Sequence, residues 1–176
     1  MHADGRVVYN VNQHLERLDG LARLIQGSAK ELITRCEKQT GKVLLVTQGW
    51  RSLADQMLIY QRGRTLNRQT HVWEISEPSQ VVTRAKPGTS AHNVITKAGA
   101  PSSMALDVIP YKADGTIDWN VSDEFWDEVY NIAWRVGLDP LGDPIGSYLA
   151  GDKGHFEEPA WKLKLEGLGL VQPVEV

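Results

Sequence analysis

The 176-residue chain has a single cysteine, no long hydrophobic run and no block of charges of one sign. One cysteine excludes an internal disulfide, and Cys36 falls within an apolar periodicity, so we expect a small core residue rather than a nucleophile. No segment approaches the roughly 18 uninterrupted apolar residues of a membrane-spanning helix. The first ten residues lack the apolar stretch of a secretory signal. We therefore expect a protein made in a cytoplasm and not bound to a membrane.

The charge balance disfavours some kinds of binding partner. With 19 basic and 22 acidic residues, the formal net charge is only -3. Tight electrostatic binding to nucleic acid or to an anionic membrane needs clustered basic residues, so both partners are disfavoured. The length, the 41% hydrophobic content and the absence of a linker or repeat predict one domain over residues 1–176. We expect a helical part at about 10–40, a catalytic core at about 43–160, and a monomer.

The N-terminal third carries a helical pattern. Apolar residues between positions 11 and 36 recur in steps of three and four, which predicts one long helix or two helices separated near Gly27. Residues 43–47 form a β-branched and leucine run that indicates a buried strand. Ser52 provides a cap for a helix that begins at Leu53.

The remaining chain alternates polar segments with short apolar ones. Residues 64–89 indicate an irregular polar connection, and Ser122 caps a helix that ends at Gly137. Further strands are expected at residues 104–109 and 155–157, and a short terminal helix or tail at residues 161–170. Helices and short strands in this order, without βαβ alternation, predict an α+β fold with a small, mainly antiparallel sheet.

Few residues are available for metal or acid–base chemistry. Of five histidines, His2 lies in the terminal segment, His14 on the polar side of the first helix and His71 in the polar connection. His92 and His155 remain, near predicted strand ends and among glycine, serine and acidic residues. Spacing alone does not distinguish a metal site here from scattered polar residues.

Asp107 is a third candidate. It lies in a predicted strand, on the same face as Ala105 and Ile109. A buried carboxylate without a partner is costly, and a bound cation is one way to offset that cost. Zinc in a hydrolase needs about three protein ligands from His, Asp, Glu or Cys.

Three short motifs favour the metal interpretation. Residues 90–93 (SAHN), 105–107 (ALD) and 152–157 (DKGHFE) follow the order S-x-H, A-x-D, [DE]-x-x-H-x-E. This series resembles the signature of the VanY and L-alanyl-D-glutamate peptidase family, zinc peptidases of the bacterial cell wall. Residues 47–52 (TQGWRS) and 62–65 (RGRT) resemble further elements of that family. The resemblance implies a fold of the Hedgehog and DD-peptidase type.

The resemblance also implies roles for individual residues. One Zn²⁺ per chain would be held by His92, Asp107 and His155, with Asp152 as the general base. Two neutral imidazoles and one carboxylate leave the ion net positive, which lowers the pKa of bound water. Arg51 would hold substrate or stabilise an oxyanion, and a structural salt bridge is the alternative.

Weaker candidates surround these motifs. Glu157 would orient a ligand or remain a solvated carboxylate, and Ser90 would hydrogen-bond near the first histidine or be a plain turn serine. Gln56 and Trp50 are candidates for substrate binding or for support of the site.

The other tryptophans and the basic residues leave similar alternatives open. Trp126 and Trp134 lie on a predicted helix and are expected in the core, whereas Trp161 is a candidate to line a cleft. Lysines and arginines at positions 62, 64, 68, 84 and 86 could meet substrate carboxylates or form a solvated surface.

Two features depart from the family pattern. His92 and Asp107 are 15 positions apart, and the extra residues 94–104 resemble an insertion that could form a lid or a cleft wall. The base position holds Asp152 instead of the glutamate of many relatives, as in phage endolysins that cut between L-alanine and D-glutamate.

The resemblance therefore implies a phage lysin, made in a host cytoplasm and released to its substrate, bacterial peptidoglycan. One alternative keeps the zinc chemistry but removes terminal D-alanine, as a D-alanyl-D-alanine carboxypeptidase or dipeptidase. A second alternative is a catalytically silent wall-binding module.

Overall fold

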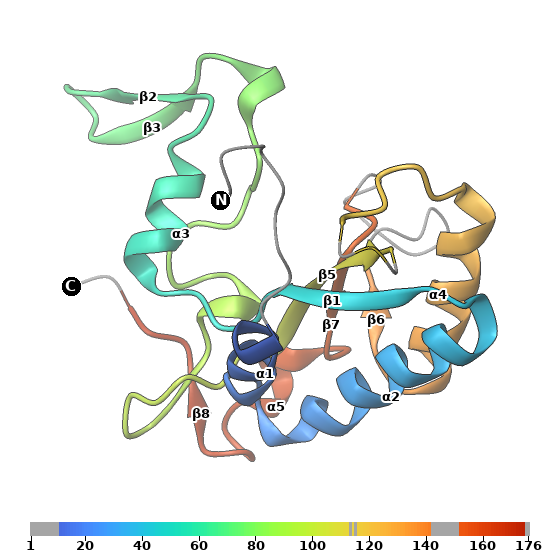
Figure 1. Cartoon of the computed structure of the whole chain (residues 1–176). Helices are drawn as coiled ribbons and strands as arrows, with labels where there is room; N and C mark the ends of the chain where they lie inside the picture. Colours follow the sequence, from blue (N-terminus) through green and yellow to red (C-terminus); the bar gives the residue numbers. More distant parts are fainter. Residues whose placement is uncertain (1–10, 113, 115, 142–151, 175–176) are drawn as a thin grey trace.

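A four-stranded antiparallel sheet forms the centre of the protein (Figure 1). The structure is a computed structural model, and it describes residues 11–112, 114, 116–141 and 152–174. The strands follow the order β1 (Val43–Gln48), β5 (Ala105–Tyr111), β7 (His155–Glu157) and β6 (Asp139–Pro140). The predicted α+β class with a mainly antiparallel sheet is confirmed.

Two helices, α2 (Arg23–Thr40) and α4 (Asp123–Arg135), pack on one face of this sheet. Leu106 and Val108 of β5 point into the core between the sheet and the helices. Asp107 and Ile109 alternate with them and are only half-buried on the opposite face. The predicted alternation along this strand is confirmed, and it places a carboxylate on the open side of the sheet.

The break between the first two helices does not lie near Gly27. Helix α1 (Val11–Asp19) ends before Gly20, and Ser103 holds the connection, because its N–H donates to Gly20 O (2.9 Å) and its carbonyl accepts from Ala22 N (2.8 Å). Gly27 lies inside α2, with open space where a Cβ would stand. Gly27 therefore does not break the helix, and the real break is set by contacts with Ser103, more than 80 residues further along the chain.

Helix α1 covers the outer edge of β1. His14 Nδ1 accepts a hydrogen bond from Val46 N at 3.2 Å, and Arg17 Nη1 donates to Val46 O at 2.9 Å. An edge strand with unpaired backbone groups invites wrong pairing, and these side chains prevent it. His14 was expected on the polar side of its helix, but it faces the sheet, while Leu15 is exposed.

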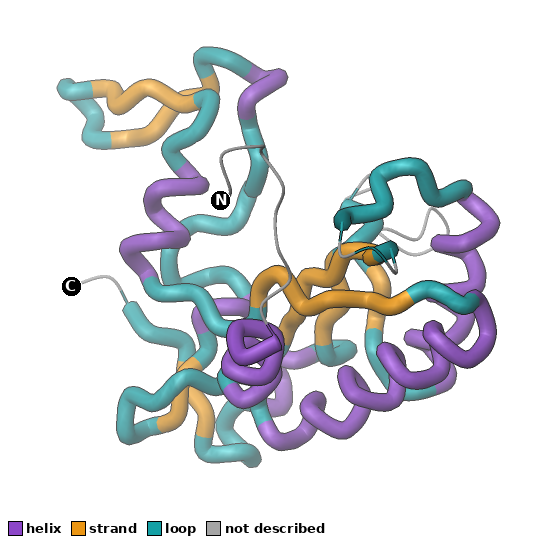
Figure 2. Tube along the Cα trace, in the orientation of Figure 1, coloured by secondary structure: helices purple, strands orange, loops and turns teal. Residues whose placement is uncertain are grey.

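An arm of chain stands away from the central sheet (Figure 2). It begins with α3 (Leu53–Tyr60), where Ser52 Oγ accepts from Asp55 N at 3.0 Å as predicted. The arm continues through a hairpin of β2 (Arg64–Asn67) and β3 (Val72–Ile75), followed by η1 (Pro78–Gln80). The hairpin was wrongly predicted as irregular chain, since its two faces are both partly exposed and leave no clean alternation.

Residues 94–104 are packed at both ends and exposed only in the middle. Strand β4 (Ile95–Thr96) pairs with β8 (Leu170–Val171), and Val94 and Met104 are fully buried. Only residues 97–101 are exposed. The insertion is therefore packed against the C-terminal segment, which also contains the short helix α5 (Trp161–Lys164).

No helix in the described part of the chain combines the length and hydropathy needed to cross a membrane. Cys36 is fully buried, as predicted, and burial raises the pKa of its thiol. It is therefore a poor nucleophile.

Alanine substitutions at two glycines, Gly154 and Gly27, test the packing of the sheet. A Cβ at Gly154 would overlap the carbonyl oxygen of Val108, whose N–H donates to Gly154 O at 2.9 Å. We expect Gly154→Ala to lower the free energy of unfolding by ~1–3 kcal/mol, because β7 must move away from β5. Gly27→Ala is the control and should raise it by ~0.5–1 kcal/mol. Urea unfolding of both variants checks this, and similar effects at the two positions would contradict it.

Candidate metal centre

Three side chains from separate segments converge on the open side of the sheet. His92 lies in η2 (Ala91–Asn93), and Asp107 lies directly opposite His155 in the pairing of β5 with β7. Asp107 Oδ1 is 2.8 Å from His155 Nδ1 and 3.2 Å from His92 Nε2, and the two imidazole nitrogens are 3.3 Å apart. The structure thus brings together all three residues predicted as ligands.

Hydrogen bonds on the outer side of each ring decide which nitrogen faces inward. His92 Nδ1 lies 2.6 Å from Gly49 O, and because a carbonyl only accepts, Nδ1 carries the proton and Nε2 presents its lone pair. His155 Nε2 lies 3.5 Å from Glu157 Oε2, which favours Nδ1 as the inward atom. Such outer partners are typical of metal-binding histidines.

This donor set fits one divalent metal ion. With both rings neutral, three lone-pair atoms face one another, and a cation is what satisfies them. Two imidazole nitrogens and one carboxylate oxygen suit zinc, whose tetrahedral ligands at ~2.0–2.1 Å stand roughly 3.3 Å apart. The inward atoms of His92, Asp107 and His155 are already near that spacing, and these residues form a group that could bind one ion.

In the absence of a metal ion, a proton on His155 supplies the positive charge that faces Asp107. Burial alone would raise the pKa of Asp107, but His92 and His155 outweigh it and hold this pKa well below its usual range. Burial would lower the pKa of His155, but hydrogen bonds to Asp107 and Glu157 raise it to about 10. The metal-free protein therefore holds His155 as an imidazolium against the Asp107 carboxylate.

Arg51 contacts the outer oxygen of the candidate ligand Asp107. Its Nη2 lies 3.3 Å from Asp107 Oδ2, and its Nη1 donates to Gln56 Oε1 at 2.9 Å. Gln56 is fully buried and donates to Ala85 O at 2.8 Å. Gln56 thus supports Arg51 from inside the protein and does not face a substrate. Arg51 is half-buried and combines a structural ion pair with a position beside the candidate metal.

Ser90 and Trp50 make structural contacts near the candidate metal centre. Ser90 Oγ accepts from His92 N at 3.3 Å and caps η2, so it fixes the backbone of the candidate ligand. Trp50 is half-buried, its backbone oxygen accepts from Gln48 Nε2 at 2.7 Å, and its Cβ lies close to Gly20. The Trp50 side chain thus packs toward the α1–α2 break.

Asp152 lies beside the converging residues. Its backbone oxygen accepts from His155 N at 3.1 Å, which closes a tight turn before β7. The residue is exposed overall, but partial desolvation and the charge of Asp107 raise the pKa of its carboxyl, against the opposing effect of His155, His92 and Arg51. A carboxylate with a raised pKa beside a metal centre suits proton transfer.

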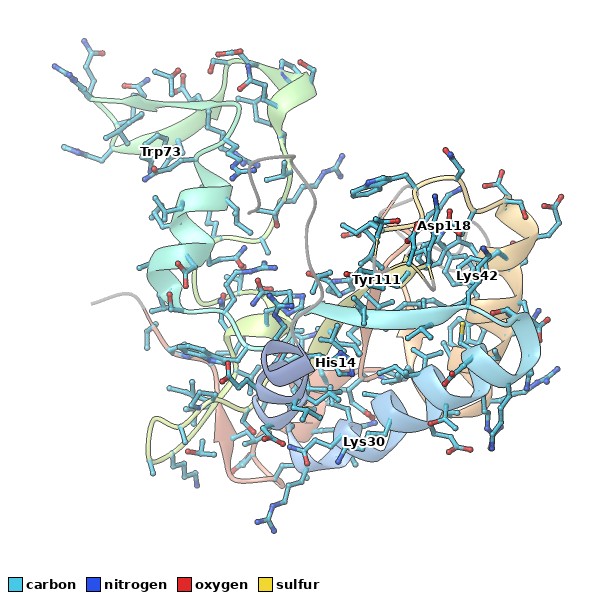
Figure 3. All side chains as sticks on the ribbon, viewed as in Figure 1. His14, Lys30, Lys42, Trp73, Tyr111 and Asp118 are labelled. Atoms are coloured by element: carbon cyan, nitrogen blue, oxygen red, sulfur yellow. The ribbon has the colours of Figure 1, made fainter. Side chains whose placement is uncertain are left out.

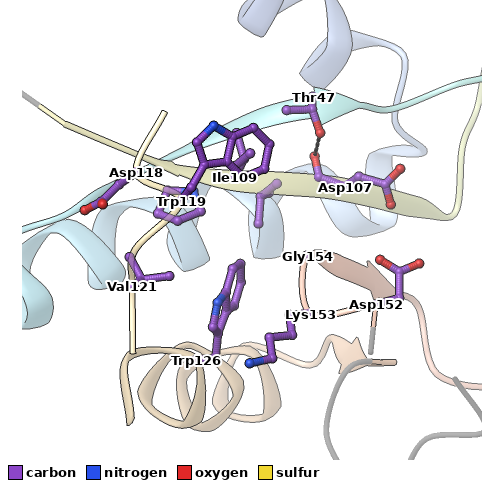
Figure 4. Close-up of a pocket in the computed structure, with 12 residues that line it drawn as sticks. Thr47, Asp107, Ile109, Asp118, Trp119, Val121, Trp126, Asp152, Lys153 and Gly154 are labelled. Carbon is purple, nitrogen blue, oxygen red and sulfur yellow. Dashed lines mark hydrogen bonds between the residues drawn. The ribbon is translucent and has the colours of Figure 1, made fainter. Parts of the chain in front are cut away.

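A pocket of about 420 Å³ lies beside β5, between this centre and α4 (Figure 4). It is lined by Asp107 and Asp152 at one end and by Trp119 and Trp126 further along. Trp126 is largely buried, as predicted, yet its edge lines the pocket. Trp119 was not singled out from the sequence, although a tryptophan between polar residues in a loop is a signal of exposure.

Two other tryptophans lie elsewhere than predicted. Trp161 was expected to line a cleft, but it is buried in the small second core with Val94 and Met104. Trp134 was expected in the core, but it is 46% exposed. On α4 the inward stripe follows Trp126, Val129 and Ala133, and position 134 falls beside it.

Sequence comparison with known proteins tests the family resemblance. No family model matches the chain. The chain is 29% identical over 107 residues to the peptidoglycan L-alanyl-D-glutamate endopeptidase CwlK of Bacillus subtilis. This chain resembles the VanY and L-alanyl-D-glutamate peptidases. The alignment covers 57% of this chain and about half of the relative, 53% of its length.

Solved structures agree on the fold. VanYB in complex with D-Alanine-D-Alanine matches with a TM-score of 0.51 at 15% identity, over 84% of this chain and 78% of that one. The vancomycin-resistance D,D-pentapeptidase VanY from a VanB-type cassette, solved with Zn(II), matches with a TM-score of 0.50 at 15% identity, over 78% and 72%. The predicted peptidase-like fold is therefore confirmed, and zinc is present in the second neighbour.

The protonated His155 predicts a pH dependence of stability for the protein kept metal-free with a chelator. A folded-state pKa of about 10, raised from 6.5, adds stability that is complete below pH 6.5 and is lost as the pH rises toward about 10. His155→Gln cannot titrate. The difference in free energy of unfolding between wild type and this variant should be constant from pH 5 to about 6.5 and shrink above it. A difference that stays constant up to pH 10 would contradict the assignment.

Proposed function

We propose that the protein is a zinc-dependent peptidase that hydrolyses the bond between L-alanine and D-glutamate in the peptide stems of bacterial peptidoglycan. The convergence of His92 Nε2, Asp107 Oδ1 and His155 Nδ1 within hydrogen-bonding distance carries the metal part of this proposal. The similarity to CwlK supports the choice of bond.

Each residue at the centre has a proposed task. His92, Asp107 and His155 would hold the ion, and zinc, when bound, supplies a Lewis acid that lowers the pKa of a water molecule and polarises a carbonyl. Asp152 accepts a proton from the attacking water and returns it to the leaving amine. Arg51 holds the outer oxygen of Asp107 and offers its remaining N–H donors to the substrate carbonyl.

The same geometry would serve a D-alanyl-D-alanine carboxypeptidase or dipeptidase, and one neighbour in fold was solved with D-Alanine-D-Alanine. Mass analysis of digested peptidoglycan distinguishes the two activities. New N-terminal D-glutamate with L-alanine left on the glycan supports the proposal, whereas release of free D-alanine favours the second activity.

We further propose the biological role of a phage endolysin that acts on the wall after release from the host cytoplasm. The support is the aspartate at position 152, which the chain shares with the endolysin type of the family. Action as a monomer and the absence of nucleic-acid binding stay predictions.

Two substitutions separate metal binding from proton transfer. His155→Ala removes a proposed ligand, so it should abolish both activity and stoichiometric zinc. Asp152→Asn keeps the shape but cannot accept a proton, so we expect turnover to fall by ~10²–10⁴-fold with zinc retained. Elemental analysis and amine release from purified peptidoglycan measure the two properties.

Asp127→Asn is the matched control, because Asp127 is an exposed carboxylate on α4 outside the centre. It should leave zinc content and turnover unchanged. Near-normal turnover of Asp152→Asn would exclude Asp152 as the base, and full zinc content in His155→Ala would exclude the ligand set.

A further inference from the structure

The loop between β5 and α4 presents an exposed indole. Trp119 is 75% exposed, although Asp118 before it is buried and Val121 after it packs against the main core. Such a large apolar side chain gains little from folding in this position. Single exposed apolar side chains are common on protein surfaces, so the significance of Trp119 depends on the pocket that it borders.

Three contacts hold this loop in place. Lys42 Nζ lies 2.6 Å from Asp118 Oδ2, and Figure 3 labels the two residues in the same region of the molecule. Asp118 N donates to Pro110 O at 2.9 Å, and Lys112 N donates to Thr116 O at 2.8 Å. The chain next to Trp119 is thus tied back to β5, so less of its backbone has to be ordered when a ligand binds, which lowers the entropic cost of binding.

Trp119 and Trp126 border the same pocket, with Ile109 and Val121 as further apolar lining. Figure 4 shows Asp118 and Val121 at one end of this pocket and Asp107 and Asp152 at the other. The pocket therefore adjoins the candidate metal centre. Its volume of about 420 Å³ lies in the range of small-molecule sites and far exceeds the need of an alanine methyl group.

The charges around the pocket disfavour an anionic occupant. Asp118 is paired with Lys42, and Lys153, the cation among the described lining residues, is paired with Asp123. No unpaired cation among these residues is available for a carboxylate of the stem peptide. A neutral ligand with one apolar face and a polar edge fits better, since indoles stack on such faces while the oxygens of Thr47 and the aspartates accept hydrogen bonds at the rim.

We infer that this pocket binds an N-acetylated sugar of the glycan strand, with Trp119 stacked on the pyranose ring. The inference rests on the proposed function. In peptidoglycan the L-alanine of the proposed scissile bond is joined directly to the lactyl group of the muramoyl sugar. The sugar therefore lies one residue from the bond that is cut, as the pocket lies next to the metal centre. A bond between two terminal D-alanines would place the sugar several residues away.

The kinetic test compares two substrates that differ only in the sugar. One is the disaccharide carrying the stem peptide, and the other is the same peptide with an N-lactoyl group on its L-alanine. Trp119→Ala should lower kcat/KM for the glycosylated substrate about tenfold and change that for the lactoyl peptide by less than about twofold. Trp119→Phe should recover most of the loss. Trp134→Ala, which removes an exposed tryptophan outside the pocket, should change neither.

Equal losses on both substrates in Trp119→Ala would overturn the inference, because the pocket would then hold peptide. No loss on either substrate would overturn it as well. Cleavage of the lactoyl peptide by the wild type reports on the proposed function separately.

A binding measurement tests the sugar site independently of the proposed peptidase activity. The disaccharide of N-acetylglucosamine and N-acetylmuramic acid, with its lactyl carboxyl converted to the neutral amide, has no peptide bond between L-alanine and D-glutamate. It can therefore be titrated into the intact protein while the indole N–H signals are followed by NMR. We expect the Trp119 signal to shift and the binding to be lost in Trp119→Ala but kept in Trp134→Ala. If the Trp119 signal does not shift while the lactoyl peptide is still cleaved, the inferred sugar site is wrong and the proposed peptidase activity is unaffected.

Discussion

The pairing of Asp107 with His155 across β5 and β7 is the constraint on which the candidate centre depends. Antiparallel register sets these residues directly opposite each other, with Oδ1 and Nδ1 2.8 Å apart. A slip of one residue would turn Asp107 into the apolar core and put Leu106 or Val108 on the open side. The core packing that fixes the sheet therefore also fixes two of the three candidate ligands.

The third candidate ligand comes from irregular chain and is fixed by hydrogen bonds instead. His92 is held through its ring by Gly49 O, through its backbone N–H by Ser90 and through its backbone carbonyl by Arg51 N at 2.9 Å. Gly49 and Arg51 follow β1, so the strand end that neighbours β5 also carries the partners of η2. Burial of the imidazole then locks its tautomer, since no water competes for Gly49 O.

Much of this arrangement follows from the sequence, and the failures have physical causes. Ser52, Ser122 and the alternation around Asp107 are local signals, and they predicted their elements well. The helix break near Gly20 depends on Ser103, a contact distant in sequence that no local pattern contains.

The candidate site shows the same division between local and distant information. The motifs indicated the converging residues, but the support that Gln56 gives Arg51 and the pocket beside Trp119 depend on the folded path of the chain. The hairpin β2–β3 and the pairing of β4 with β8 were missed because short strands with one or both faces exposed carry little hydrophobic periodicity.

The central claim is that His92, Asp107 and His155 hold one ion through defined atoms. Crystals of the purified protein, measured on both sides of the zinc absorption edge, test it most directly. The account predicts a single anomalous peak within ~2.0–2.2 Å of His92 Nε2, Asp107 Oδ1 and His155 Nδ1. A zinc-loaded protein with its peak at other residues, or with His155 bound through Nε2, would contradict it.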